Sequence, residues 1–142
     1  ACQKAVSILH SSLKNNSINF VFEAVENIEV DGYPNEFSQA FLNILSNAKD
    51  VLIERKIENP YIHVSIKTGK KFVLIHVKDN GGGISNAVID HIFEPYFTTK
   101  HAKQGTGIGL YMCKTIIEGN MNGIIKASNT EDGALFTIKV LL

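Results

Sequence analysis

Residues 39–50 constrain the fold of this chain most, because amide and carboxylate side chains interrupt what is otherwise the pattern of a core helix. At about 100° per residue, Asn43, Asn47 and Asp50 fall on one narrow stripe of that helix. A wide apolar face lies beside the stripe and comprises Phe37, Ala40, Phe41, Ile44, Leu45, Ala48, Val51 and Leu52. Such a stripe is either a solvated helix side or one wall of a ligand pocket, and by itself it favours the solvated side.

Length and charge favour one domain without a general affinity for polyanions. The 142 residues suffice for a domain with its own core. Lys+Arg and Asp+Glu both number 14, so the net charge of zero gives no bulk attraction to nucleic acid or to an anionic membrane. The sequence has no apolar run of about 18 residues and no signal-peptide pattern, so we expect a cytoplasmic domain with no direct membrane contact. We also expect the isolated domain to be a monomer. Because the sequence begins with Ala1 and not Met, we expect it to be a piece of a longer protein, whose membrane anchorage stays open.

Two cysteines and the order of the predicted elements narrow the fold class. Cys2 and Cys113 indicate a reducing compartment, with Cys113 in the core. Periodicity predicts a helix in 1–14, strands at 18–25 and 28–30, a helix at 34–56, strands at 61–67 and 72–78, a short helix at 85–92, a loop at 93–104, a helix opened by 105–109 and stopped at 119–120, and strands at 123–128 and 134–141. Because the predicted strands follow one another in pairs along the sequence, we expect a two-layer α/β sandwich: a mixed, mostly antiparallel sheet covered on one face by helices.

The run Asp79-Asn-Gly-Gly-Gly83 follows a strand that has the pattern of a buried one. Asp-Asn-Gly is common in plain turns, which is the simpler interpretation. Three successive glycines exceed the need of a turn, however, and suggest that a ligand approaches the backbone closely. An ionised carboxylate accepts hydrogen bonds, so Asp79 would suit an exocyclic amine such as that of adenine.

The run Gly105-Thr-Gly-Ile-Gly-Leu110 places glycines at alternate positions where a helix begins. Free N–H groups and the positive end of the helix dipole favour a phosphate there, while close helix packing is an equally open alternative. The run is no Walker loop, since it lacks Gly-Lys-Ser/Thr, and no strand precedes it as in a dinucleotide fingerprint. Asn47 offers an amide oxygen to Mg²⁺, so Asn47, Asp79 and this run together predict a Mg·ATP site.

Four segments, taken in order, resemble the N, G1, F and G2 boxes of the catalytic ATP-binding (HATPase) domain of two-component sensor histidine kinases. They are Asn43-Ile-Leu-Ser-Asn47-Ala, Asp79-Asn-Gly-Gly-Gly83-Ile, Ile92-Phe93-Glu-Pro-Tyr-Phe97-Thr-Thr-Lys100 and Gly105-Thr-Gly-Ile-Gly-Leu110. The resemblance spans about residues 18–141 and implies the Bergerat fold of the GHKL superfamily, shared with gyrase, mismatch-repair and chaperone ATPases. It implies an ATP-binding kinase domain at 17–142 and, at 1–16, a linker or the end of a preceding helical dimerisation segment.

The resemblance also implies roles for individual residues. Asn47 would ligate Mg²⁺, Asn43 would act beside the phosphates or metal-bound waters, and Asp79 would bind the adenine amine. Lys100 is the second implied catalytic residue, reaching the phosphates. The other implied ATP contacts are Gly81, Gly83 and Ile84 in the adenine pocket, Phe93, Phe97 and Thr99 in the lid region, Gly105, Thr106, Gly107, Ile108, Gly109 and Leu110 at the phosphates, and Thr137 on the adenine side. For the two phenylalanines, ordinary core packing is equally compatible.

As an activity, the resemblance implies that the domain binds Mg·ATP and donates the γ-phosphoryl group to a histidine on a dimerisation domain of the same protein. A response regulator would act downstream, and the parent protein would be a homodimer. Two features depart from the family: Asp50 stands where many members carry a basic residue, and no His is followed closely by an acidic residue, His10 preceding Ser11-Ser12.

Three alternatives remain within the superfamily or beside it: an ATPase that drives conformational change, an anti-sigma-type protein kinase, and a nucleotide-sensing module. In the ATPases the residue matching Asn43 is a glutamate that activates water. An amide cannot accept a proton as a general base, so Asn43 favours the kinase.

Overall fold

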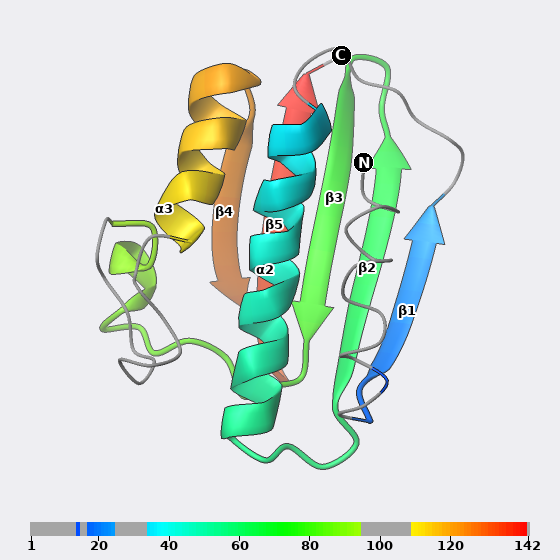
Figure 1. The fold of residues 1–142 in the computed structure, drawn as a ribbon, viewed down its shortest axis with the longest axis vertical. Helices are drawn as coiled ribbons and strands as arrows, with labels where there is room; N and C mark the ends of the chain where they lie inside the picture. Colours follow the sequence, from blue (N-terminus) through cyan, green and yellow to red (C-terminus); the bar gives the residue numbers. More distant parts are fainter. Residues whose placement is uncertain (1–13, 15–16, 25–33, 95–108, 142) are drawn as a thin grey trace.

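The computed structural model describes residues 14, 17–24, 34–94 and 109–141. Its strands are β1 (Asn19–Ala24), β2 (Tyr61–Thr68), β3 (Phe72–Asp79), β4 (Ile124–Asn129) and β5 (Ala134–Leu141). Its helices are α2 (Pro34–Glu54), α3 (Gly109–Lys114), a 3₁₀ turn η1 (Ile89–His91) and a π-helix η2 (Thr115–Asn120). The strands form one sheet in the order β1-β2-β3-β5-β4, and α2 and α3 lie on one of its faces (Figure 1).

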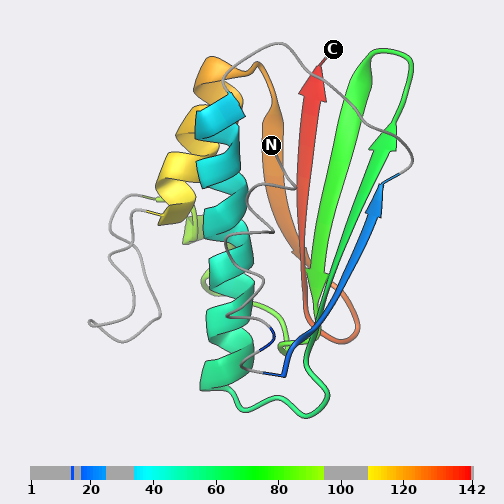
Figure 2. The same ribbon diagram turned by 45° about the vertical axis from the view of Figure 1, so that its right-hand side comes forward.

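The sheet is mixed, as predicted. β1 pairs parallel with β2, whereas the β2–β3, β3–β5 and β4–β5 pairs are antiparallel. Among the described elements, both long helices stand on the same side of the sheet, and the opposite face carries none (Figure 2). The predicted two-layer α/β sandwich is therefore confirmed.

The core lies between α2 and the covered face of the sheet. Of the apolar face predicted for α2, every residue is buried except Val51, which is half-buried. β2, β3 and β5 bury alternate side chains toward the helices, since successive residues point to opposite faces. In β3 the buried row is Val73, Ile75, Val77 and Asp79. Asp79 thus continues an apolar row, so its carboxylate lies on the helix side of the sheet.

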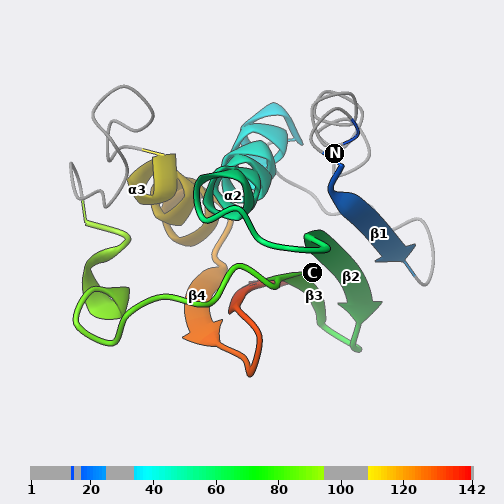
Figure 3. The ribbon, with the colours of Figure 1, turned by 90° about the horizontal axis from the view of Figure 1, so that it is seen from below.

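Three chain segments meet where the nucleotide-binding loop is predicted, at the lower end of Figure 1. They are the C-terminal end of α2, the last residue of β3 and the turn between β4 and β5, and the view from below shows them at one edge of the two layers (Figure 3). This convergence brings together residues that are far apart in the sequence.

Two predicted helices differ from the structure. In 85–92 only Ile89–His91 forms a 3₁₀ turn: the Ser85 hydroxyl accepts a hydrogen bond from the amide of Ala87 (3.2 Å), as at a helix start, but the later bonds from His91 to Val88 and from Glu94 to His91 join residues three apart. The central helix ends at Glu54, two residues before the predicted end at 56. The predicted strand 28–30 and the helix in 1–14 fall outside the described residues, apart from Lys14.

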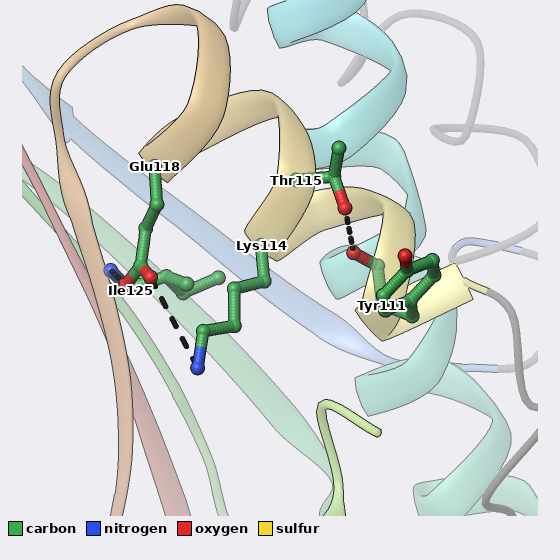
Figure 4. Close-up of polar contacts among 5 residues, drawn as sticks. All are labelled: Tyr111, Lys114, Thr115, Glu118 and Ile125. Carbon is green, nitrogen blue, oxygen red and sulfur yellow. Dashed lines mark hydrogen bonds and ion pairs between the residues drawn. The ribbon is translucent and has the colours of Figure 1, made fainter. Parts of the chain in front are cut away.

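The helix that follows the glycine run is anchored to the sheet by its π-helical end. The Glu118 carboxylate accepts a hydrogen bond from the amide of Ile125 on β4 (3.3 Å) and lies 4.0 Å from the Lys114 Nζ (Figure 4). One turn earlier, the Thr115 hydroxyl donates to the Tyr111 carbonyl (3.0 Å). These contacts fix α3 above β4, which sets where its first residue lies against α2.

No helix among the described residues is both long enough and apolar enough to cross a bilayer.

Candidate functional site

Asp79 is a buried carboxylate at the end of β3, with its side chain only 4% exposed. Its Oδ1 accepts a hydrogen bond from the backbone amide of Gly81 (2.8 Å). Loss of hydration raises the pKa of Asp79 above its usual value, and the backbone amides of Gly81 and Ala134 and the charge of Arg55 oppose this rise. The fold therefore supplies several partners that favour the ionised form at a site that otherwise disfavours charge.

The glycine loop after Asp79 is held from both sides. Asn80 bridges to the β2 edge, where its Oδ1 accepts from the Tyr61 amide (2.9 Å) and its Nδ2 donates to the Asn59 carbonyl (3.0 Å). On the other side, the Gly82 amide donates to the Asp132 carbonyl (3.0 Å). Gly82 has φ +91° and Gly83 has φ +85°, a region in which glycine is favoured. The loop is thus a defined turn whose shape needs these two glycines.

Asn129 at the end of β4 clamps the end of this loop. Its Oδ1 accepts from the Ile84 amide and its Nδ2 donates to the Ile84 carbonyl, both at 2.7 Å. The side chain therefore replaces a backbone strand partner for Ile84. The sequence analysis did not single out Asn129, which lies between the predicted strands 123–128 and 134–141, because a contact 45 residues away leaves no local pattern.

Gly133, in the same turn, lies against Asp79. A Cβ added at Gly133 would be 2.2 Å from the Asp79 carbonyl oxygen and 2.9 Å from its Oδ1. Only a residue without a side chain lets β5 approach the end of β3 this closely. The sequence offered a signal, a glycine directly before a strand, but not the identity of its neighbour.

Arg55 is a second residue that the sequence interpretation missed. It follows the last residue of α2, and its Nη1 donates to the carbonyls of Gly81 (2.6 Å) and Gly83 (2.9 Å). On the inner side of the same loop, a Cβ added at Gly81 would be 2.8 Å from a Val51 methyl group. The C-terminal part of α2 therefore packs directly on the glycine loop.

The other end of the polar stripe faces α3. Asn43, Asn47 and Asp50 are all half-buried. The Asn43 Oδ1 accepts a hydrogen bond from the side-chain Nε2 of Gln39 (3.3 Å). The Asn43 Cγ is 3.9 Å from the position that a Cβ at Gly109 would take. The N-terminal part of the stripe therefore lies beside the first residue of α3 and is not a freely solvated helix side.

Cys113 is the neighbour of Asn43 on α3 and is fully buried, as predicted. Its thiol donates to the Ala40 carbonyl (3.1 Å). Burial raises the pKa of Cys113 to about 12, although a hydrogen bond with the Asn43 side chain opposes the rise. The thiol is consequently protonated at neutral pH and serves packing between α2 and α3.

The two ends of the site are joined by a single ridge on α2. Asn43, Asn47, Val51 and Arg55 follow one another at intervals of four residues, which places them along one row of the helix surface. The row runs from the start of α3 to the glycine loop, about 18 Å along the helix axis at 1.5 Å per residue. An elongated ligand with an amine at one end and anionic groups at the other matches this arrangement.

Phe93 and Leu110 belong to the packing around α3. Phe93 stands edge-on to Phe136 of β5, with 6.3 Å between ring centroids, and the Lys114 Nζ lies 5.9 Å from the Phe93 centroid. Leu110 is half-buried against the core. Of the remaining predicted contacts, Phe97, Thr99, Lys100, Gly105, Thr106, Gly107 and Ile108 lie outside the described residues.

The prediction that Thr137 lies on the adenine side is wrong. In β5 the side chains of Phe136 and Ile138 are buried toward the helices, so Thr137 between them points to the opposite face. There its hydroxyl lies 3.2 Å from the His76 Nδ1. Asp79 points to the helix face, so the sheet separates the two side chains.

The donor set on α2 suits a cation with few protein ligands. Asn43 and Asn47 bring two amide groups one helical turn apart. Within the described part of the chain, no three His, Cys, Asp or Glu side chains gather into a group that would hold a metal. Mg²⁺ commonly keeps several waters and substrate phosphate oxygens, so it fits this donor set better than a metal that needs a full protein cage.

Comparison with known proteins places the chain in a family. The sequence model of the family of histidine kinase-, DNA gyrase B- and HSP90-like ATPases matches residues 32–142. The chain therefore belongs to this ATPase family.

Within that family, its similarity is to sensor kinases. It is 32% identical to the two-component sensor PprA of Pseudomonas aeruginosa over 146 residues, which cover 100% of this chain and 16% of PprA. It is 30% identical to the sensor histidine kinase ZraS of Escherichia coli, over 94% of this chain and 28% of ZraS. The chain thus spans less than a third of the length of these two relatives.

Solved structures give the same result. The catalytic domain of the histidine kinase ThkA superposes with a TM-score of 0.85 and 28% identity, covering 98% of this chain and 90% of that domain. The resemblance to histidine kinase catalytic domains and the fold class that it implied are both confirmed.

Proposed function

We propose that this domain binds Mg·ATP and donates the γ-phosphoryl group to a histidine on a separate dimerisation domain of its parent protein. The observation that carries the proposal is the α2 ridge, which connects a buried carboxylate loop at one end with the start of α3 at the other. Membership of the ATPase family supports nucleotide binding, and the similarity to sensor kinases supports phosphoryl transfer.

In this proposal the adenine lies at the glycine loop. The Asp79 carboxylate accepts a hydrogen bond from the exocyclic amine, and Gly81, whose missing side chain leaves room for Val51 beside the carboxylate, forms the wall with Gly83 and Ile84. The support is that Asp79 is buried and already accepts one hydrogen bond from the Gly81 amide, which orients the carboxylate.

The phosphates lie along the N-terminal part of the ridge. Asn47 supplies an oxygen to Mg²⁺, with Asn43 beside it and Gly109 and Leu110 at the start of α3. For Lys100 and residues 105–108, which lie outside the described residues, the family resemblance is the support for a phosphate contact. When bound, Mg²⁺ neutralises phosphate charge, and the side chains of α2 hold the triphosphate in position, which is most of what phosphoryl transfer requires.

Asn43 favours transfer over hydrolysis. Its amide oxygen accepts a hydrogen bond from Gln39 at 3.3 Å, and an amide does not accept a proton from water as a general base. The domain would therefore release phosphate very slowly by itself and would pass phosphate to a histidine presented by a second domain. A response regulator would then receive it; the histidine kinase ThkA, 26% identical to this chain, has been crystallised with the response regulator TrrA.

The test is a transfer assay with γ-labelled ATP, the 142-residue domain and the separately purified dimerisation domain of the parent protein. We expect label on the dimerisation domain only when both proteins and Mg²⁺ are present, and loss of transfer in Asn43→Ala with the ATP affinity changed far less. Steady phosphate release by the domain alone, lost in Asn43→Ala, would instead support a conformational-switch ATPase.

A further inference from the structure

Arg55 occupies a position that the end of α2 fixes. Lys56 has φ +52°, its amide donates to the Ile53 carbonyl (3.2 Å), and the Ile57 amide donates to the Leu52 carbonyl (3.2 Å). This pair of bonds is a Schellman motif, in which Lys56 is the left-handed residue and Arg55 is the helix C-cap. Ile57 packs against the core and closes the motif. The backbone of Arg55 is therefore locked where its side chain reaches the glycine loop.

The two carbonyls that Arg55 binds lie in the loop after β3, which has no strand pairing. Gly82 and Gly83 adopt left-handed conformations, and this turn leaves the carbonyls of Gly81 and Gly83 within 2.6 and 2.9 Å of the same guanidinium nitrogen. Guanidinium carries five N–H donors in a rigid plane, whereas an ammonium is a compact point charge on a flexible stem. Arginine is therefore better suited than lysine to hold two carbonyls at a fixed separation.

The charge of Arg55 acts at two further places. It stands at the C-terminus of α2, where a cation interacts favourably with the helix dipole. It also lowers the pKa of Asp79, opposing the effect of burial. One side chain thus links the helix end, the shape of the loop and the ionisation of the buried carboxylate.

We propose that Arg55 is a positioning residue of the nucleotide site, which holds the Gly81 and Gly83 carbonyls so that the loop presents Asp79 to adenine before the nucleotide binds. The proposal rests on the proposed function, because it assumes that adenine binds at Asp79. Arg55 itself need not touch the nucleotide. Its contribution is to keep the loop in one conformation, so that binding does not have to order it.

The proposal predicts a pattern across three variants in calorimetric titrations with Mg·ATP. Arg55→Met removes the charge and both hydrogen bonds, and we expect ATP affinity to fall about tenfold or more. Arg55→Lys keeps the charge and loses the planar Nη1 group that donates to both carbonyls, so we expect a smaller loss. Lys56→Met removes a neighbouring exposed charge and should leave ATP affinity unchanged.

The pH dependence separates positioning from a general loss of stability. Affinity should fall on acidification as Asp79 becomes protonated, and without the Arg55 charge this fall should begin at a higher pH. Arg55→Met should therefore shift the profile upward, while Arg55→Lys should retain the original profile. A fold defect would lower affinity at every pH and would not separate the two variants.

Hydrogen exchange of the nucleotide-free domain tests the loop directly. We expect the Gly81 and Gly82 amides, bonded to Asp79 and Asp132, to exchange faster in Arg55→Met and at the original rate in Lys56→Met. Unchanged exchange, affinity and pH profile in folded Arg55→Met would overturn the proposal. So would an equal effect of Lys56→Met.

The failure of the proposed function has a different signature. If Asp79→Asn binds Mg·ATP like the unaltered domain, adenine does not bind at Asp79, and the positioning role for nucleotide falls with it. If Asp79→Asn loses affinity while Arg55→Met does not, the nucleotide site stands and only the role of Arg55 is rejected.

Discussion

The two ends of the α2 ridge are built differently. At the Asp79 end, the loop is held by the side chains of Arg55 after α2 and Asn129 at the end of β4, and its own Asn80 side chain bonds the backbone of Asn59 and Tyr61, with distances of 2.6 to 3.0 Å. At the Asn43 end, the Gln39 and Asn43 side chains form a hydrogen bond at 3.3 Å, and Gly109 and Cys113 of α3 pack beside Asn43. The proposed adenine end is thus preformed by tertiary contacts, whereas the described residues of the proposed phosphate end belong to one helix face and the start of another.

The largest disruption of this contrast should come from Gly133→Ala. The new Cβ would meet the Asp79 carbonyl oxygen at 2.2 Å, so the backbone of β3 or β5 has to move. We expect the free energy of unfolding to fall by about 1 to 3 kcal/mol, as for other overpacked sites, with loss of ATP binding. Chemical denaturation measures the first effect and calorimetry the second.

Gly119→Ala is the matched control for that variant. Apart from its chain neighbours and the backbone of its own helix, no atom of the described residues lies within 4 Å of the position its Cβ would take, so alanine should leave stability unchanged or improve it slightly. Equal destabilisation by the two substitutions would show that the approach of Gly133 to Asp79 is not what matters.

Asp79→Asn tests the chemistry of the adenine end and not its packing. The amide keeps nearly the same shape but turns one acceptor into a donor, which opposes the adenine amine. We expect ATP affinity to fall by about 1.5 to 3 kcal/mol, the usual value for a hydrogen bond to a charged group. Asp132→Asn removes the same charge from an exposed neighbouring residue and should bind ATP normally.

The raised pKa of Asp79 predicts that binding and stability change with pH in opposite directions. Because the folded-state pKa lies above the usual value of 3.8, the stabilisation that Asp79 contributes is full below pH 3.8 and is lost as pH rises through the folded-state pKa. ATP affinity should instead rise over that interval, since binding needs the ionised form. Titrations and denaturation curves at several pH values check this, and Asp79→Asn should remove both dependences.

Cys113 offers a probe of the other end. With a pKa of about 12 and a side chain that is 0% exposed, the thiol should resist alkylation at pH 8 in the folded domain. Peptide mass spectrometry should find Cys113 modified only after denaturation. Rapid modification under native conditions would mean that α3 separates readily from α2.

The smallest effect is expected for Thr137→Val. The substitution removes a hydroxyl that lies 3.2 Å from His76 on the outer face of the sheet, which should cost about 1 kcal/mol of stability at most. ATP affinity should not change, because the residue is separated from Asp79 by the sheet. A loss of affinity would restore Thr137 to the site.

Much of the fold could be predicted from local patterns. The apolar residues of α2 recur with a period of 3.6 residues, and those of β2, β3 and β5 recur with a period of 2. Each of these elements lies close to its predicted bounds. The same rule, applied to residues 134–141, would have placed Thr137 opposite Phe136 and avoided that error. The predicted helix at 85–92 is reduced to a 3₁₀ turn, in which the backbone bonds from His91 to Val88 and from Glu94 to His91 join residues three apart.

The sequence by itself determined the two-layer sandwich, the buried row that ends at Asp79, the polar stripe on α2 and the family to which the chain belongs. Only the tertiary structure decided which residues hold the site together: Arg55 binds a loop 26 and 28 residues away, Asn129 one 45 residues away, and Gly133 admits β5 beside Asp79. Helix and strand periods arise between near neighbours, so a sequence displays them. A guanidinium meeting two carbonyls depends on where α2 stops and where β3 ends, and no local pattern encodes that distance.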